Sequence, residues 1–169
     1  MSMLTLDVGC GERKHGGLGI DVRLTPHVDL LASTYFLPFK AEIFDKVYMF
    51  EVLEHLENPS GALREVGRVL RRAGTVEGSI PNPYWCGRLL RVIMHRDLEE
   101  QYTSCEHINA WTISELRHLV HRCRLELRSC RYGDSGFYKG LGSLVQLLRL
   151  NRLLKAITNH QLLFQVRKP

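Results

Sequence analysis

Hydrophobic residues fall into short runs along this chain, separated by glycine, proline and polar turns. The first run spans residues 4–8 and stops at Gly9 and Gly11, and the second spans 18–20 and ends on Asp21. Apolar runs of this length that end at glycine predict buried strands. Because a βαβ crossover normally needs at least about 10–12 residues including its helix, we expect a tight loop between these two strands.

Five later segments continue the strand pattern. Each is a short apolar run or alternates apolar with polar residues, as the strands of a packed sheet do. They are residues 27–31, 44–50, 75–80, 124–132 and 161–166. In the fourth of these segments, alternation would put Leu127 and Ser129 on one face of the strand and Cys130 on the other.

Capping residues mark the starts of two expected helices. Asn58 supplies a capping side chain and Pro59 suits the first helical position, so a helix should begin there and stop at Gly74. Thr112 and Glu115 have the spacing of a capping box, which predicts the start of a second helix.

Length and composition fit one soluble globular domain covering residues 1–169. The chain is 44% hydrophobic and 24% charged, close to the average for such domains. Its apolar runs are too short to span a bilayer, and the first strand follows Met1 too closely for a signal peptide. The cysteines are odd in number and form no CxxC pair. We therefore expect a reduced, cytoplasmic protein with neither disulfides nor a bound metal.

The net charge of +5 comes from the second half, because residues 83–169 are strongly basic and residues 1–82 are slightly acidic. A basic half would attract a phosphorylated substrate, an anionic membrane surface or nucleic acid, or would simply be solvated. Residues 144–157 have the pattern of a basic amphipathic helix, which either packs on the sheet or lies on a membrane and guides a lipid-like acceptor. Nucleic acid is supported by charge alone, so we do not expect it as a partner.

The glycines after the first strand and the acid after the second predict a nucleotide pocket. Gly9 and Gly11 would let the backbone approach a ligand closely, and an acid at the tip of the next strand holds a ribose hydroxyl in doubly wound α/β sheets. The dinucleotide fingerprint does not fit, because Lys14 replaces its third glycine and Asp21 follows too soon. A nicotinamide-dependent oxidoreductase is therefore disfavoured.

The sequence LDVGCG at residues 6–11, followed by GID at 19–21, resembles the first two motifs of class I S-adenosylmethionine (SAM)-dependent methyltransferases. Within that class it is similar to type-11-like members with a shortened glycine loop. The resemblance implies a doubly wound, Rossmann-like, mostly parallel seven-stranded α/β sheet with an antiparallel last strand and a truncated first helix. It also implies S-adenosyl-L-methionine as the cofactor.

The same resemblance implies which residues bind SAM. Asp21 would hold the ribose, and Ser33 stands where the family often has an acid against the adenine. Without a first helix, whose dipole would favour the methionine carboxylate, Arg13 and Lys14 are placed to offset that charge, unless both are solvated loop cations. The implied cofactor-binding residues are Asp7, Gly9, Cys10, Gly11, Lys14, Asp21, Ser33, Leu37 and Glu51.

Two further motifs resemble the acceptor side of the family's pocket. The sequence E-V-L-E-H-L makes Glu51, Glu54 and His55 candidates for the pocket wall or for proton transfer, unless Glu54 and His55 stabilise local structure instead. The pattern E-H-x-x-x-x-T makes His107 a candidate general base, since an imidazole pKa near 6.5 suits proton transfer, or else a histidine that holds its loop in shape. The predicted catalytic residues are His107 and Glu51.

These features favour a methyltransferase acting on a small molecule, a lipid or a glycan precursor. Residues 83–110 and 133–158 lie where such folds insert substrate-side segments, and a strand ending in I-P-N is similar to small-molecule members. The alternative is a catalytically degenerate domain kept as a scaffold or subunit, which the uncharged Ser33 would fit. The sequence specifies neither the acceptor nor the oligomeric state, and a partner chain could complete the acceptor pocket.

Overall fold

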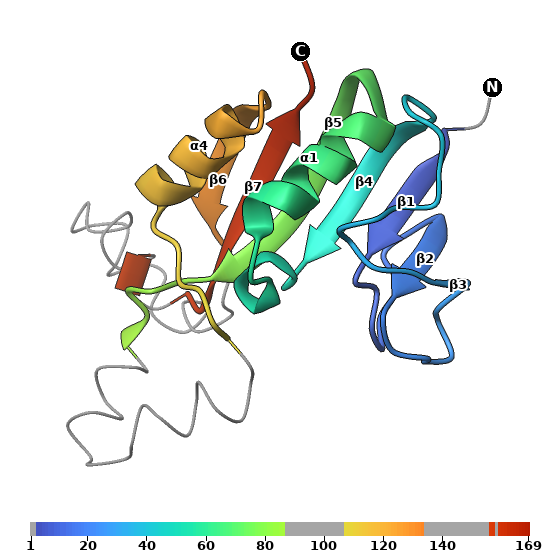
Figure 1. Ribbon diagram of the computed structural model, residues 1–169. Helices are drawn as coiled ribbons and strands as arrows, with labels where there is room; N and C mark the ends of the chain where they lie inside the picture. Colours follow the sequence, from blue (N-terminus) through green and yellow to red (C-terminus); the bar gives the residue numbers. More distant parts are fainter. Residues whose placement is uncertain (1–2, 87–106, 134–155, 158) are drawn as a thin grey trace.

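The computed structural model describes residues 3–86, 107–133, 156–157 and 159–169. Within these residues seven strands form one sheet (Figure 1). The strands are β1 (Thr5–Val8), β2 (Leu18–Asp21), β3 (Leu30–Leu31), β4 (Phe44–Phe50), β5 (Leu70–Pro81), β6 (Glu126–Tyr132) and β7 (Gln161–Arg167). The helical elements are the 3-10 helix η1 (Leu53–His55) and the α-helices α1 (Pro59–Val69) and α4 (Ile113–Arg122).

The strands follow the order β3-β2-β1-β4-β5-β7-β6 across the sheet. Neighbouring strands from β3 to β5 are parallel, whereas β7 is antiparallel to both β5 and β6. This confirms the predicted mixed sheet with an antiparallel last strand. Because β1, β2 and β4 run in the same direction, their carboxyl ends meet at one edge, which is where doubly wound sheets bind ligands.

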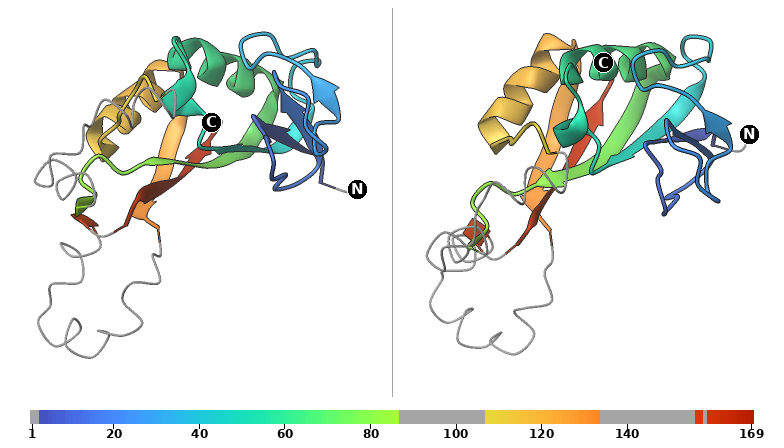
Figure 2. Two further views of the ribbon diagram at one scale, coloured as in Figure 1. Left: turned by 90° about the horizontal axis from the view of Figure 1, so that it is seen from below. Right: turned by 60° about the horizontal axis from the view of Figure 1, so that its bottom comes forward.

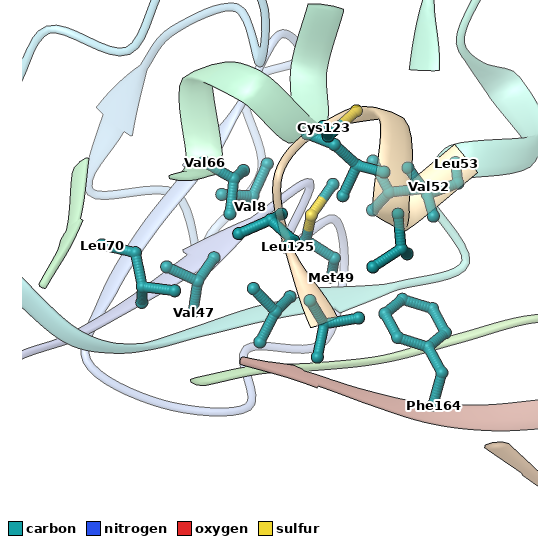
Figure 3. Close-up of a cluster of buried hydrophobic side chains, with 14 of the residues drawn as sticks. Val8, Val47, Met49, Val52, Leu53, Val66, Leu70, Cys123, Leu125 and Phe164 are labelled. Atoms are coloured by element: carbon teal, nitrogen blue, oxygen red, sulfur yellow. The ribbon is translucent and has the colours of Figure 1, made fainter. Parts of the chain in front are cut away.

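Both α-helices pack on the same face of the sheet (Figure 1, Figure 2). Val66 of α1 and Leu116 of α4 are fully buried in one cluster with Val47 and Met49 of β4 and Phe164 of β7. Figure 3 shows part of this cluster. Each large apolar side chain buried in this way contributes about 1.5–3 kcal/mol to folding, and the resulting core holds the strand ends in fixed positions.

Helix α1 begins where the sequence predicts and ends earlier than expected. The side chain of Asn58 caps it by accepting an N–H group of the first turn at 2.9 Å. The helix ends at Val69 rather than at Gly74, because Leu70 has extended backbone angles and already pairs with Phe44 in the sheet.

Two strands also differ from the prediction. β3 is limited to Leu30–Leu31, where the sequence suggested residues 27–31. In β6 the register shifts between Leu127 and Ser129, so one extra residue interrupts the alternation. As a consequence Cys130, rather than Ser129, packs with Leu127 against the core.

The capping box before α4 is confirmed. Thr112 and Glu115 accept from each other's backbone N–H groups, at 3.2 and 2.7 Å. The predicted helix at 144–157 lies almost entirely outside the described residues, as do large parts of 83–110 and 133–158. Among the helices that the structure does describe, none combines the length and the apolar character needed to cross a membrane.

Candidate functional site

Two glycines after β1 have backbone angles that other residues rarely adopt. Gly9 has a φ of +67° and Gly11 a φ of +48°. The N–H groups of Gly9 and Cys10 donate to the carbonyl oxygen of Ile20 at 2.8 and 3.1 Å. A Cβ atom at Gly9 would lie 2.7 Å from Cγ2 of Val52. The loop therefore needs glycine at this position and lies tightly against β2.

The carboxylate of Asp21 is fixed at the end of β2. Its Oδ2 accepts the N–H of Gly11 at 3.0 Å, and its Oδ1 accepts the N–H of Arg23 at 2.9 Å. The described loop 9–17 contains no helix, as the truncated first helix of the prediction requires. Each carboxylate oxygen can accept a further bond, so Asp21 is positioned and still able to bind a ligand hydroxyl.

A cavity of about 710 Å³ opens at the carboxyl ends of β1, β2 and β4. Its wall combines the glycine backbone, carboxylates, hydroxyl groups and an imidazole. It is lined by Gly9, Asp21, Val22, Arg23, Ser33, Thr34, Tyr35, Glu51, Val52, His55, Leu56 and Glu57. Small-molecule and cofactor sites measure about 300–1,000 Å³, so this cavity has room for a nucleoside-sized ligand.

Glu51, directly after β4, has a strained backbone. Its φ is +53°, a region that costs an L-residue roughly 1–2 kcal/mol. The N–H of Glu51 donates to the carbonyl oxygen of Ser79 at 3.1 Å, and the Ser79 hydroxyl donates to Oε1 of Glu51 at 2.6 Å. Strain of this kind persists where neighbouring bonds enforce it, and it concentrates at functional sites. Here it holds a carboxylate in the cavity wall.

The segment that precedes α4 is tied to η1. The N–H groups of Ile108 and Asn109 both donate to the carbonyl oxygen of Glu54, each at 3.0 Å. These bonds bring His107 beside His55, with 4.7 Å between their ring centroids. Because His55 lines the cavity, His107 lies next to the cavity wall although it is distant in the sequence.

Glu54 is fully buried in η1, with 0% of its surface exposed. In the part of the chain that the structure describes, neither carboxyl oxygen of Glu54 has a hydrogen-bond partner. Burial and the neighbouring charge of Glu51 raise the pKa of Glu54 to about 8. The side chain of Glu54 does not line the cavity, and η1 has no side-chain cap.

Residues 19–77 match the model of a family described as a methyltransferase domain. The match runs from β2 into β5 and includes the cavity residues Asp21, Ser33 and Glu51. The chain has the fold of the class I methyltransferases, and residues 19–77 are similar to a methyltransferase domain. The sheet order and the antiparallel β7 agree with this class, and the family implies SAM as the cofactor.

Two solved structures share the fold of the methyltransferase domain. An S-adenosylmethionine-dependent methyltransferase from Mesorhizobium loti is 14% identical, with a TM-score of 0.66 and coverage of 98% of this chain and 90% of that chain. A Haloferax volcanii protein solved in complex with the Trm112 methyltransferase activator is 16% identical, with a TM-score of 0.62 and coverage of 99% and 83%. At such identities the likeness shows the fold alone.

A curated relative is similar in sequence. It is an uncharacterised protein of Methanocaldococcus jannaschii that is 35% identical over 94 residues, which cover 47% of this chain and 37% of that protein. The chain thus spans little more than a third of the length of this relative.

The predicted cofactor residues fall into two groups, those that line the cavity and those that do not. The cavity wall includes Gly9, Asp21, Ser33 and Glu51. The remaining residues, which the structure also describes, do not line the cavity; they are Asp7, Cys10, Gly11, Lys14 and Leu37. These residues make contacts within and around the loops beside the cavity.

Asp7 and Cys10 form hydrogen bonds that hold the glycine loop in place. Buried Asp7 accepts the N–H of His15, whose Nδ1 lies 3.6 Å from Oδ2 of Asp7. Burial raises the pKa of the Asp7 carboxyl, although His15 opposes the shift. The thiol of Cys10 donates to the carbonyl oxygen of His27 at 3.6 Å, and burial raises its pKa as well. Both side chains act on the shape of the loop.

Lys14 and Leu37 also have partners within the domain. The ammonium group of Lys14 lies 2.7 Å from Oδ2 of Asp29, and the same carboxylate accepts the N–H of Gly19 at 2.7 Å. The carbonyl oxygen of Leu37 accepts from the guanidinium group of Arg68 at 2.9 Å. Lys14 therefore links the glycine loop to the segment before β3, and Leu37 anchors its turn to α1.

Tyr35 and Glu57 line the cavity, and the sequence analysis did not select them. The N–H of Tyr35 donates to the Ser33 hydroxyl at 3.3 Å, and the Tyr35 hydroxyl accepts the N–H of Asn58 at 3.1 Å. Their one signal in the sequence is proximity, because Tyr35 follows Ser33 in a turn and Glu57 precedes the helix cap. A sequence does not show which way such side chains face.

Proposed function

We propose that this chain binds SAM in the cavity and transfers its methyl group to a small molecule, a lipid or a glycan precursor. The observation that supports this most is the joint placement of Gly9, Asp21 and Glu51 around one cavity at the carboxyl ends of three parallel strands. Exposed backbone and two carboxylates suit a ligand that carries both a sugar and positive charge. SAM has a ribose, a sulfonium and an ammonium group.

In the proposal, one residue of the cavity wall binds each part of SAM. Asp21 accepts hydrogen bonds from the ribose hydroxyls with the acceptor positions left free by Gly11 and Arg23. Ser33 offers the adenine an uncharged acceptor. Glu51 places its carboxylate near the cationic methionine end, where opposite charges attract in a partly enclosed cavity.

Methyl transfer from a sulfonium is a direct displacement, so the domain's main task is to align the acceptor atom with the methyl group. A base is needed only where an acceptor holds its proton tightly. We assign that role to His107, which lies against His55 of the cavity wall, and name Glu51 as the second candidate.

Isothermal titration calorimetry with SAM and with S-adenosylhomocysteine tests the cofactor site. We expect one site per chain, and we expect Asp21→Asn to weaken binding about tenfold to hundredfold, as the loss of hydrogen bonds to a charged group predicts. Glu126→Gln is the control, because Glu126 is an exposed acid of β6 that pairs with Arg128 and does not line the cavity. A folded wild-type protein that releases no binding heat would overturn the proposal.

The acceptor class needs its own experiment. The protein would be incubated with methyl-labelled SAM and, separately, with metabolite, lipid-extract and glycan-precursor fractions. We expect label in one of these fractions and a lower rate for His107→Ala at unchanged SAM affinity. Label confined to added RNA, DNA or protein would overturn the proposed acceptor class while leaving the methyltransferase assignment intact.

A scaffold or subunit that has lost catalysis is the second candidate. Two observations favour it: Ser33 stands where the family often has an acid, and the Haloferax volcanii neighbour was solved with an activator protein. The same calorimetry separates the candidates, because a scaffold without a working pocket should bind neither SAM nor S-adenosylhomocysteine.

A further inference from the structure

The carboxyl group of Glu54 is buried and lacks a hydrogen-bond partner among the described residues. Its side chain is 0% exposed, and both oxygens lack hydrogen-bond partners within the described residues. Buried polar groups are nearly always hydrogen-bonded, and an unpaired buried carboxylate is costly. Such a group therefore calls for an explanation, which is a retained proton, a positive charge on a neighbouring imidazole or a bound cation.

Two imidazoles converge on this carboxyl group. Ligand atoms of Glu54, His55 and His107 all lie within 4.8 Å of one another, and the two rings are 4.7 Å apart. The convergence is built into the backbone, since Ile108 and Asn109 donate to the carbonyl oxygen of Glu54 and so hold His107 over η1. Three ligands at about 2.0–2.2 Å from one ion lie roughly 3–3.5 Å apart, a spacing that small side-chain rotations would reach.

We propose that Glu54, His55 and His107 form a binding site for a divalent first-row transition-metal ion. Two imidazole nitrogens with one carboxylate oxygen suit zinc, iron or cobalt, whereas magnesium prefers oxygen ligands alone. Three protein ligands leave coordination positions open for water or a ligand oxygen. Since His55 also lines the cavity, the ion would lie at the cavity wall near Glu51. With His107 bound to the ion, the role of base would pass to Glu51, the second candidate named above.

This site departs from the expectation of no metal, which rested on the cysteines. Cys10 and Cys123 are buried, with pKa values raised by burial, so neither thiol is a competing thiolate ligand. Glu54 and His55 are adjacent, and His107 comes from a distant segment. The sequence therefore contains no short metal-binding motif that would predict this site.

Cobalt(II) is a suitable probe, because its visible spectrum reports the ligand type and the geometry. The chelator-treated protein of residues 1–169 would be titrated with Co²⁺ in calorimetry and absorption experiments, without SAM. We expect one equivalent to bind with nitrogen and oxygen ligation and without a thiolate charge-transfer band. Glu54→Gln and His107→Ala should each weaken binding at least about tenfold, the loss that even outer-shell changes cause.

His121→Ala is the matched control, because His121 is an exposed histidine of α4 outside the cluster. Circular dichroism and thermal unfolding would establish that each variant is folded, and Glu54→Gln keeps the shape of the side chain. Absence of stoichiometric binding, or binding that both cluster variants retain, would overturn the metal site and leave a protonated Glu54 or a charged imidazole beside it as the explanation. Since no SAM is present, this result is independent of the cofactor titration.

Discussion

The side-chain amide of Asn109 donates to the carbonyl oxygen of Leu56 at 2.7 Å. Leu56 directly follows η1 and lines the cavity, while Asn109 belongs to the segment that carries His107. This bond adds to the two backbone bonds that join the same elements. The position of His107 over the cavity wall therefore depends on a small hydrogen-bonded junction.

Replacing Asn109 with Ala should loosen this junction. This bond is only partly buried, and a typical hydrogen bond contributes about 0.5–1.5 kcal/mol, so we expect the free energy of unfolding to fall by about 1 kcal/mol. Urea denaturation would measure the change, with the exposed Ser114→Ala as the control. An unchanged unfolding midpoint for Asn109→Ala would show that the backbone bonds alone hold the junction.

Gly9→Ala should abolish SAM binding and also lower the stability of the fold, by roughly 1–2 kcal/mol for the backbone angle alone. The new methyl group would meet Cγ2 of Val52 at 2.7 Å, and the φ of +67° is unfavourable for alanine. Gly67→Ala is a matched control, because a Cβ there meets Leu125 at an ordinary 3.5 Å. Since alanine is preferred to glycine inside a helix, that control should gain about 0.5–1 kcal/mol of stability. Calorimetry with SAM would compare the two; equal affinities would show that the loop adapts to a side chain.

The strand segments and the short glycine loop could be predicted because they depend on local pattern, whereas the strand directions followed from the resemblance to class I methyltransferases. The apolar run before Gly9, the close spacing to Asp21 and the cap at Asn58 are each features of a few adjacent residues, and the structure has the expected elements there. Boundaries failed where a tertiary contact decided them. Leu70 leaves helix α1 because it pairs with Phe44, a partner that no local pattern reveals.

The site was less predictable than the fold, because burial and orientation depend on the whole chain. The sequence made Glu54 a candidate for the pocket wall, for proton transfer or for local structure. Its complete burial, with Ile108 and Asn109 bonded to its carbonyl oxygen, depends on a segment that is distant in the sequence. Cys10 and Leu37 belong to motifs that the resemblance assigns to SAM, yet their bonds support the loops behind the cavity. A motif identifies which segment approaches a ligand and leaves open which side chains reach it.

Glu65 should make the stability depend on acid pH. The guanidinium of Arg68 holds the pKa of the Glu65 carboxyl below its usual 4.5, and the N–H of Leu37 adds to this shift. A lowered folded-state pKa gives stability that is present above the unfolded-state pKa and is lost as the pH falls through the folded-state value. At neutral pH we expect Glu65→Gln to lose about 1 kcal/mol.

The difference in unfolding free energy between wild type and Glu65→Gln should therefore shrink as the pH is lowered below 4.5. Urea denaturation across a series of acid pH values would measure it. Glu126→Gln, which removes an exposed acid paired with Arg128, serves as the control and should show a smaller pH dependence. A difference that stays constant down to the acid limit would mean that Glu65 gains nothing from its charge.

Arg13 should contribute to SAM affinity through the methionine carboxylate. Its neighbour Lys14 is already paired with Asp29 at 2.7 Å, so of the two loop cations named in the sequence analysis the exposed Arg13 is the one available to offset that charge in the absence of a first helix. We expect Arg13→Ala to weaken SAM binding by a few-fold to about tenfold, as for a partly screened ion pair.

Binding of 5′-methylthioadenosine, which lacks the carboxylate, should be unchanged in Arg13→Ala. Lys14→Ala should instead lower stability by loosening the contact with Asp29. Calorimetry with both ligands decides the matter, since an equal loss for the two ligands in Arg13→Ala would trace the effect to the loop's shape and not to the carboxylate.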